Sequence, residues 1–140
     1  MRKLESKELL NLCVTGMRLS LGIIFLWFGL IKFSEYNPVF EIINASFPFL
    51  AVRPGLYFLA GLESLIGLGL FLNIFPRIVH ITLILHLLGT FSTFILSPEI
   101  MFYPHFPFLN LAGEFVVKNL ALAMGGLLIL HHEQHKNEKV

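Results

Sequence analysis

Four long stretches of apolar residues constrain what this chain can fold into more than any other feature. They run over residues 9–31, 54–74, 78–96 and 109–130. Each has about 20 residues, which is the length that an α-helix needs to cross a hydrocarbon layer about 30 Å thick. The sequence therefore predicts an all-α fold, a four-helix transmembrane bundle that forms one domain over residues 1–140.

The composition agrees with a multi-pass protein in a lipid bilayer. Hydrophobic residues make up 56% of the chain and charged residues only 14%, whereas a soluble domain has about 25% charged residues. The net charge of +1, without a basic patch, argues against a nucleic-acid partner. The one cysteine, Cys13, excludes an intramolecular disulfide and a paired-cysteine redox motif.

The distribution of basic residues predicts the orientation. A four-span topology leaves only Lys32 and Arg53 on one side, both at span edges, and places on the other side Arg2, Lys3, Lys7, Arg77, Lys136 and Lys139. Because cytoplasmic loops carry the excess of Lys and Arg, both termini are predicted to be cytoplasmic. The first span is too long for a signal peptide and lacks a small-residue cleavage site, so we expect it to remain as a helix.

Ionisable residues inside the predicted spans are the main clue to function, because such groups are costly in hydrocarbon. Two cations and two anions balance each other: Arg18, Glu63, Glu114 and Lys118. Glu114 and Lys118 are four residues apart on one helix face, which we expect to point into the bundle. At a rise of 1.5 Å per residue, the four groups lie at overlapping depths of about 8 to 20 Å. We therefore expect them to form one polar cluster.

Two interpretations of this cluster stay open. A buried polar network can determine which membrane helices pack together, without binding any ligand. Intramembrane ionisable groups also mark sites for ions, protons or the headgroup of a ligand such as a quinone.

Three further polar residues are secondary candidates. Lys32 lies at a span edge, where its long stem is expected to carry the ammonium to the headgroups. Asn119 follows Lys118 in the fourth span. His86 can serve as a proton acceptor or as a metal or haem ligand, although hydrogen bonding across helices is its commoner role. It belongs to a polar stripe of the third span, together with Thr82, Thr90 and Thr93.

No metal site is predicted. His80 lies about 240° around the helix from His86, so one helix cannot hold a haem through both. The tail over residues 131–136 contains three histidines, of which His132 and His135 are three residues apart. We expect this tail to be solvated.

Two connections on the predicted outer side, residues 33–53 and 97–108, are rich in Phe, Tyr and Pro. The tetrapeptide FPFL occurs at 47–50 and again at 106–109. Such segments are typical of an interfacial aromatic belt. A lid or entrance for an apolar ligand is the alternative.

Three segments resemble the DoxX-like membrane proteins, and most of all the branch that includes the inner-membrane protein of the bacterial reactive-chlorine-resistance system. They are MRLSLGIIFLWFGLIKF (17–33), GLESLIGLGL (61–70) and FPFLNLAGEFVVKNLAL (106–122). The resemblance is carried by Arg18, residues 29–33, Glu63, Gly113 and Lys118. It implies four helices in the bacterial cytoplasmic membrane and an association with thiosulfate or quinone oxidation or with oxidative-stress complexes. Two departures are Glu114, where that branch would have an arginine, and a shorter first outer loop.

These observations predict a polytopic component of a redox or oxidative-stress system that binds quinone or another apolar ligand. Arg18 and Lys118 are expected to bind the polar head, and Glu63 or Glu114 to relay a proton. One alternative is a non-enzymatic scaffold or assembly factor that binds partner membrane proteins or redox subunits. A small proton-linked transporter is the third hypothesis, and four helices form a small translocation unit unless the protein assembles as a homo-oligomer. No soluble-type catalytic motif is present, so neither an enzymatic activity nor catalytic residues are assigned.

Overall fold

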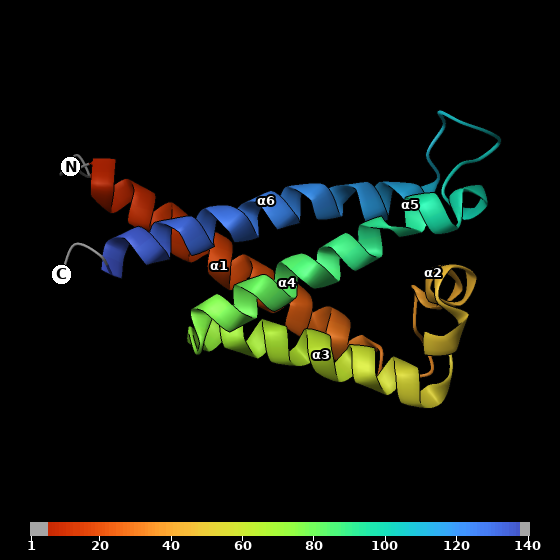
Figure 1. The fold of residues 1–140 in the computed structure, drawn as a ribbon, viewed down its shortest axis with the longest axis horizontal. Helices are drawn as coiled ribbons and strands as arrows, with labels where there is room; N and C mark the ends of the chain where they lie inside the picture. The colour runs from red at the N-terminus through yellow and green to blue at the C-terminus, as the bar shows by residue number, and fades with distance from the viewer. Residues whose placement is uncertain (1–5, 138–140) are drawn as a thin grey trace.

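The computed structural model of the chain describes residues 6–137. Within this range there is no β-strand, and four spans are long and apolar enough to cross a membrane. The predicted all-α, four-helix transmembrane fold is therefore confirmed (Figure 1). The long helices are α1 (Ser6–Ile31), α3 (Arg53–Leu72), α4 (Pro76–Phe91), which is followed by the short α5 (Thr93–Leu96), and α6 (Leu111–Asn137).

The helices differ from the predicted spans mainly at their ends. The fourth was predicted to end at residue 130, but α6 continues to Asn137 through the polar tail. Hydropathy marks the part of a helix that lies in hydrocarbon, whereas backbone hydrogen bonding can continue into the polar region beyond it. The third span is interrupted at Ser92, between α4 and α5.

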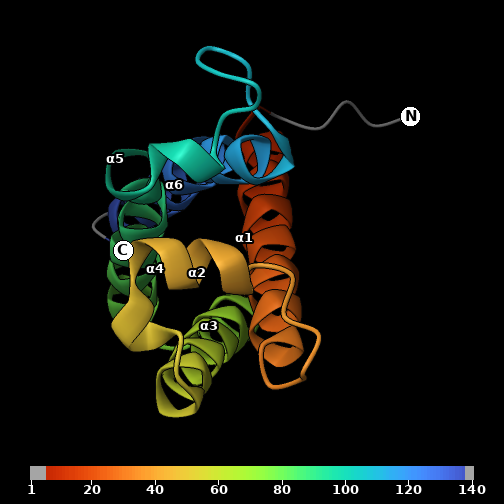
Figure 2. The same cartoon turned by 90° about the vertical axis from the view of Figure 1, so that its right-hand side faces the viewer.

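Three short helices lie in connections for which no helix was predicted. They are α2 (Phe40–Ser46), η1 (Pro48–Leu50) and η2 (Pro98–Ile100). In Figure 2, α2 lies across one end of the bundle, in front of the long helices. The first connection is therefore a folded cover and not an extended loop.

The long helices run alternately up and down, so the start of α1 and the end of α6 lie at the same end of the bundle (Figure 1). We call this the termini end, and it also contains the turn between α3 and α4. In that turn Asn73 and Phe75 have positive φ angles of 56° and 46°, and Pro76 begins α4. We call the opposite end, which carries α2, the α2 end.

Glycines allow α1 and α3 to approach each other closely. A Cβ atom on Gly29 would lie 2.6 Å from the backbone nitrogen of Ser64 and 2.8 Å from the carbonyl oxygen of Ala60. Gly22 faces Gly67 and its neighbours in the same interface. Small residues permit such backbone contact between membrane helices. The close contact brings the end of α1 against the middle of α3.

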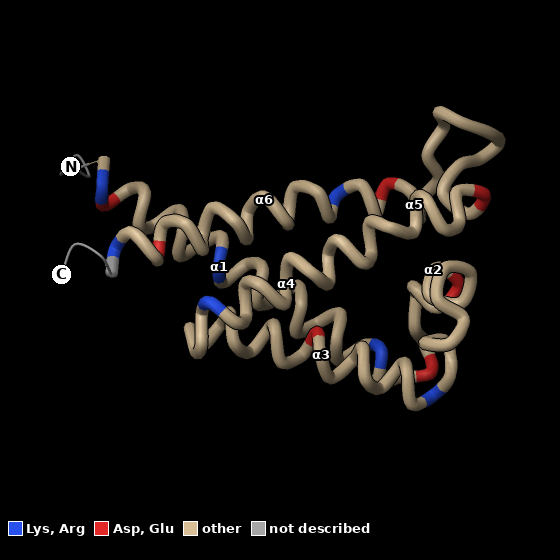
Figure 3. The backbone as a smooth tube through the Cα atoms, viewed as in Figure 1, with Lys and Arg blue, Asp and Glu red and all other residues tan. Residues whose placement is uncertain are grey.

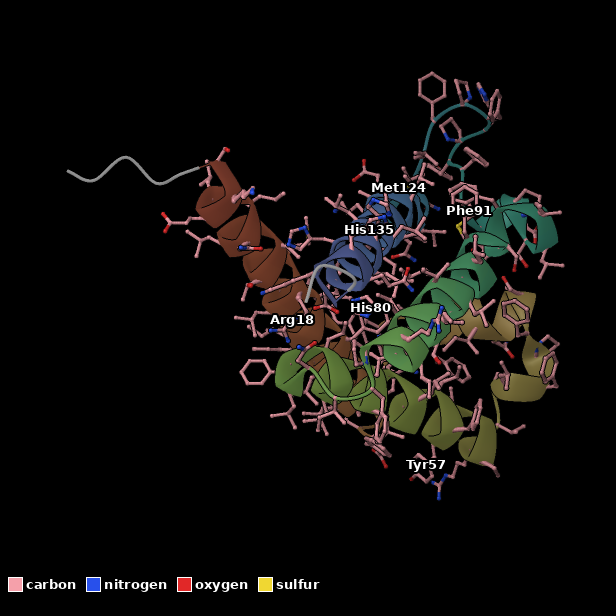
Figure 4. All side chains as sticks on the ribbon, turned by 60° about the vertical axis from the view of Figure 1, so that its left-hand side comes forward. Arg18, Tyr57, His80, Phe91, Met124 and His135 are labelled. Atoms are coloured by element: carbon pink, nitrogen blue, oxygen red, sulfur yellow. The ribbon has the colours of Figure 1, made fainter. Side chains whose placement is uncertain are left out.

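The outside of the bundle is apolar. Side chains such as Trp27, Leu65 and Leu85 are more than half exposed, and Tyr57 projects outward from α3 (Figure 4). The interior holds one apolar cluster that includes Leu21, Leu70, Leu83 and Ile129, and a smaller one at the α2 end formed by Ile42, Met101 and Val116. Lipid covers an exterior of this kind, as expected for a multi-pass membrane protein.

Candidate functional site

Three ionisable side chains from three helices meet inside the bundle. Lys32, just after α1, places its Nζ 2.6 Å from Oε2 of Glu63 on α3. His86 on α4 places its Nε2 2.8 Å from the other carboxylate oxygen, Oε1. Both oxygens of Glu63 are therefore occupied, and the carboxylate holds α1, α3 and α4 together through charge-assisted hydrogen bonds.

The hydrogen bonds determine the roles of the His86 ring. A carboxylate only accepts hydrogen bonds, so Nε2 of His86 is the donor to Glu63, and in the neutral ring Nδ1 is then an acceptor. The ring also packs edge-on against Phe25, with centroids 5.8 Å apart. One turn further along α4, the Thr90 hydroxyl donates to the His86 carbonyl at 3.1 Å. The imidazole is thus oriented and has one nitrogen left for another partner.

A cavity of about 280 Å³ adjoins this triad of Lys32, Glu63 and His86, and all three side chains line it. Asn119 on α6 lines the same cavity. It is only 7% exposed and has no hydrogen bond to any residue in the described range 6–137. Its amide atoms are not among the fully buried polar atoms without a partner, so the free amide is accessible from the cavity. The cavity thus contains a polar group that a bound molecule would satisfy.

Apolar and aromatic side chains make up most of the remaining wall. Phe25 and Phe28 contribute from α1, and Phe115 from α6. At the α2 end, Phe47 and Phe49 of the first FPFL segment also line the cavity. The first FPFL segment therefore forms part of the cavity wall. The second FPFL segment does not line it.

The structure does not bring together the predicted cluster of Arg18, Glu63, Glu114 and Lys118. Arg18 is at the termini end, where its guanidinium donates to the carbonyls of Leu70 and Phe71 and lies 3.7 Å from Glu133 (Figure 4). A cation at the last carbonyls of a helix offsets the negative end of its dipole. Arg18 therefore caps the end of α3 and does not line the cavity.

Glu114 and Lys118 are exposed, and neither has an ion pair within the described range. The shared inward face expected for the pair is thus not formed, although Lys118 lines a second cavity at the α2 end. Apolar residues of α6, among them Phe115 and Leu122, line the cavity beside Asn119, so Asn119 is the polar residue that α6 contributes to it. Of the four predicted residues, only Glu63 lies at the cavity.

The position of Lys32 also differs from the prediction. It was expected to reach toward the headgroups, but it is buried, with only 7% of its surface exposed. The reason is that α2 covers this end of the bundle, and Glu63 offers a carboxylate within reach of the lysine stem. Without Glu63, the buried Lys32 ammonium would have no compensating charge.

The other histidines form no metal site in the described residues. No group of three or more His, Cys, Asp or Glu side chains there could hold a metal ion. His80 is buried, and its Nδ1 lies 2.6 Å from the Pro76 carbonyl. In the tail, His132 bonds to Asn11 of α1 at 2.8 Å, and the rings of His131 and His135 stack 4.1 Å apart.

No protein-family model, no curated protein and no solved structure matches the chain. The resemblance to the DoxX-like proteins therefore stays a prediction. The chemistry of the site rests on the contacts of this chain alone.

Proposed function

We propose that this membrane protein binds a small apolar molecule with a polar head in the cavity beside Lys32, Glu63 and His86. The observation that carries the proposal is Asn119, a buried amide that faces this cavity without a hydrogen bond to the described part of the chain. A polar network that served only to pack helices would have its members satisfied. Ligand sites combine apolar walls with a few directed polar groups, as this cavity does.

The polar groups favour a head that carries carbonyl or hydroxyl oxygens. The Asn119 amide can donate to a carbonyl oxygen, and the Lys32 ammonium has three donors, of which one reaches Glu63 and a longer one of 3.5 Å reaches the Phe28 carbonyl. Nδ1 of His86 can accept from a hydroxyl. The same wall thus offers donors and an acceptor.

Quinones are the ligand class that we infer, in line with the DoxX-like resemblance and a role in a redox or oxidative-stress system of a bacterial cytoplasmic membrane. A quinone, when bound, supplies two carbonyl oxygens that become hydroxyls on reduction. In this protein Asn119 and Lys32 would hold the carbonyl form by donation. His86, backed by Glu63, would accept from or return a proton to the hydroxyl form.

Replacement of Asn119 by Leu tests the proposal, because it removes the free amide without breaking any side-chain hydrogen bond in the described structure. Purified protein would be stripped of bound molecules and titrated with a short-tailed quinone, with native mass spectrometry as the measurement. We expect wild type to bind and Asn119→Leu to bind at least about tenfold more weakly, since one lost hydrogen bond of about 1.4 kcal/mol corresponds to that factor.

Ala121→Leu is the matched control, because Ala121 lies on the exposed side of α6 and does not line the cavity. It adds a leucine to the same helix and should leave binding unchanged. Equal binding by all three proteins would contradict the proposal. So would wild type that binds no quinone but is recovered in fixed stoichiometry with a second membrane subunit, which is the result that the scaffold hypothesis predicts.

A further inference from the structure

A second cavity, of about 550 Å³, lies at the α2 end beside the first. The two share wall residues, among them Lys32, Phe28 and Phe115, and the two phenyl rings pack 5.7 Å apart between the cavities. We call it the outer cavity. Its walls come from α1, the segment before α2, α2 itself and the start of α6.

Residues of both α1 and α6 line the outer cavity. These helices contact each other near the termini end, where Met17 packs on Gly125 and Asn11 bonds His132. Figure 2 shows α1 and α6 as separate walls at the α2 end, with α2 lying in front of the space that the long helices enclose. In a bilayer, lipid molecules lie next to these two walls, because the outer faces of α1 and α6 are apolar.

Two hydrogen-bond donors in the outer cavity have no acceptor within residues 6–137. Lys118 lines the cavity without an ion pair. Nδ2 of Asn37 is buried without a partner, while Oδ1 of the same amide accepts from the Val39 backbone at 3.2 Å. By contrast Asn110, also in the wall, is satisfied, since it donates to the Ile100 carbonyl and accepts from Gly113 N–H, each at 2.9 Å. A ligand group that is anionic or rich in hydrogen-bond acceptors would bind these two free donors.

Glu41 of α2 lines the same cavity and is exposed, so the wall carries one unpaired cation and a carboxylate. Lys32, the other cation of the wall, is already paired with Glu63. A purely anionic ligand would be repelled by Glu41, whereas a ligand with both a phosphate and an ammonium matches both signs.

We propose that the outer cavity binds one phospholipid with a zwitterionic headgroup that bears a primary ammonium. Lys118 and Asn37 donate to its phosphate oxygens, and Glu41 accepts from its ammonium. Lys118 is seven residues after the start of α6, about 10 Å along the helix, and its stem can extend toward the headgroup level. The acyl chains leave between α1 and α6, beside Ile31 and Leu111, which also line the cavity.

Delipidated protein titrated with three phospholipids of identical acyl chains tests this proposal. The headgroups are ethanolamine, choline and glycerol, and native mass spectrometry measures the bound fraction of each. We expect the ethanolamine lipid to bind about tenfold more tightly than the glycerol lipid, which lacks the cation. The choline lipid should bind with intermediate affinity, because its ammonium has no N–H to donate.

Substitutions test the roles of Lys118 and Glu41 in lipid binding separately. Lys118→Gln should weaken binding of all three lipids about tenfold, whereas Lys118→Arg, which keeps the charge, should retain it. Glu41→Gln should remove the preference for ethanolamine over glycerol. Glu114→Gln is the matched control, because Glu114 is an exposed charge one turn from Lys118 that does not line the cavity.

Three results would overturn the proposal. One is equal retention of all three headgroups, and another is unchanged binding by Lys118→Gln. The third is displacement of the lipid by inorganic phosphate or by a second copy of the chain, seen as a dimer that Lys118→Gln abolishes. Asn119→Leu should bind the phospholipid as wild type does, so failure of this site is distinguishable from failure of the inner one.

Discussion

At the scale of single residues, Glu63 determines the character of the interior. Its side chain is 7% exposed and binds a cation through one oxygen and an imidazole through the other. A buried carboxylate in hydrocarbon is stable only with such partners, and the partners in turn depend on it. Removal of one member of the triad therefore leaves the others without their buried interactions.

Glu63→Gln should destabilise the fold by about 3 kcal/mol or more, because it leaves the Lys32 ammonium buried without a counter-charge. Thermal unfolding in mild detergent measures the effect. Lys32→Met combined with Glu63→Gln should recover much of the loss, since the double variant buries no unpaired charge. The control Glu114→Gln removes an exposed carboxylate and should change little, so similar losses in Glu63→Gln and Glu114→Gln would count against a buried pair.

At the scale of elements, the contact of α1 with α3 positions the triad. Gly29 lies against the backbone of Ser64, the residue that follows Glu63, and Lys32 follows Gly29 by three positions. Removal of the close contact would therefore widen the interface at the point where the ion pair forms.

Gly29→Ala should lower the thermal midpoint by several degrees, because the added methyl has no room and overpacking costs about 1 to 3 kcal/mol. Gly61→Ala is the matched control, since a Cβ atom on Gly61 meets nothing within 4 Å. It should unfold at the wild-type temperature or slightly above it. A midpoint that is unchanged in Gly29→Ala would show that α1 and α3 are less tightly packed than described.

The end of α3 depends on another helix, because Arg18 of α1 donates to the carbonyls of Leu70 and Phe71. Arg18→Met should cost about 1 to 3 kcal/mol in the same unfolding assay, since the last carbonyls of α3 lose a charged donor. It should leave quinone binding intact, because Arg18 does not line the cavity. Arg53→Met, at the exposed start of α3, is the control. If Arg18→Met instead lost quinone binding while its thermal stability stayed normal, Arg18 would belong to the binding site.

At the scale of the whole molecule, charge is distributed unevenly between the two ends. Lys7, Arg77 and Lys136 lie at the termini end together with Glu8 and Glu133, while the α2 end carries Glu35, Glu41 and Glu99 together with Arg53 (Figure 3). An excess of Lys and Arg is typical of the cytoplasmic side. That both termini are cytoplasmic stays a prediction from the sequence.

Cysteine labelling in intact cells tests this orientation. The single native cysteine is removed as Cys13→Ser, and new cysteines are introduced one at a time as Arg77→Cys and His105→Cys, at opposite ends of the bundle. A membrane-impermeant maleimide should label His105→Cys only, and Arg77→Cys only after the cells are opened. The reverse pattern would invert the topology.

The chain's own pattern of residues was enough to predict the four spans, the breaks between them and the all-α fold. Long apolar runs and proline-containing breaks are local properties, and a bilayer imposes a known length on each span. The same pattern placed Glu63 and His86 among the candidates, because any ionisable group in a span must find a partner. Neither the short helix α2 nor the extension of α6 to Asn137 was predicted, since neither depends on hydropathy.

Only the tertiary structure decided which of the candidate charges meet. Arg18, Glu114 and Lys118 lie in spans as Glu63 does, and depth alone suggested one cluster. Arg18 instead lies level with the last turn of α3, at the termini end, and the rotation of α6 about its axis leaves Glu114 and Lys118 exposed. These positions follow from packing between helices, such as the contact of Gly29 with α3, and from the cover that α2 forms over Lys32. An ion pair between residues 31 positions apart depends on those contacts, so a local pattern cannot specify it.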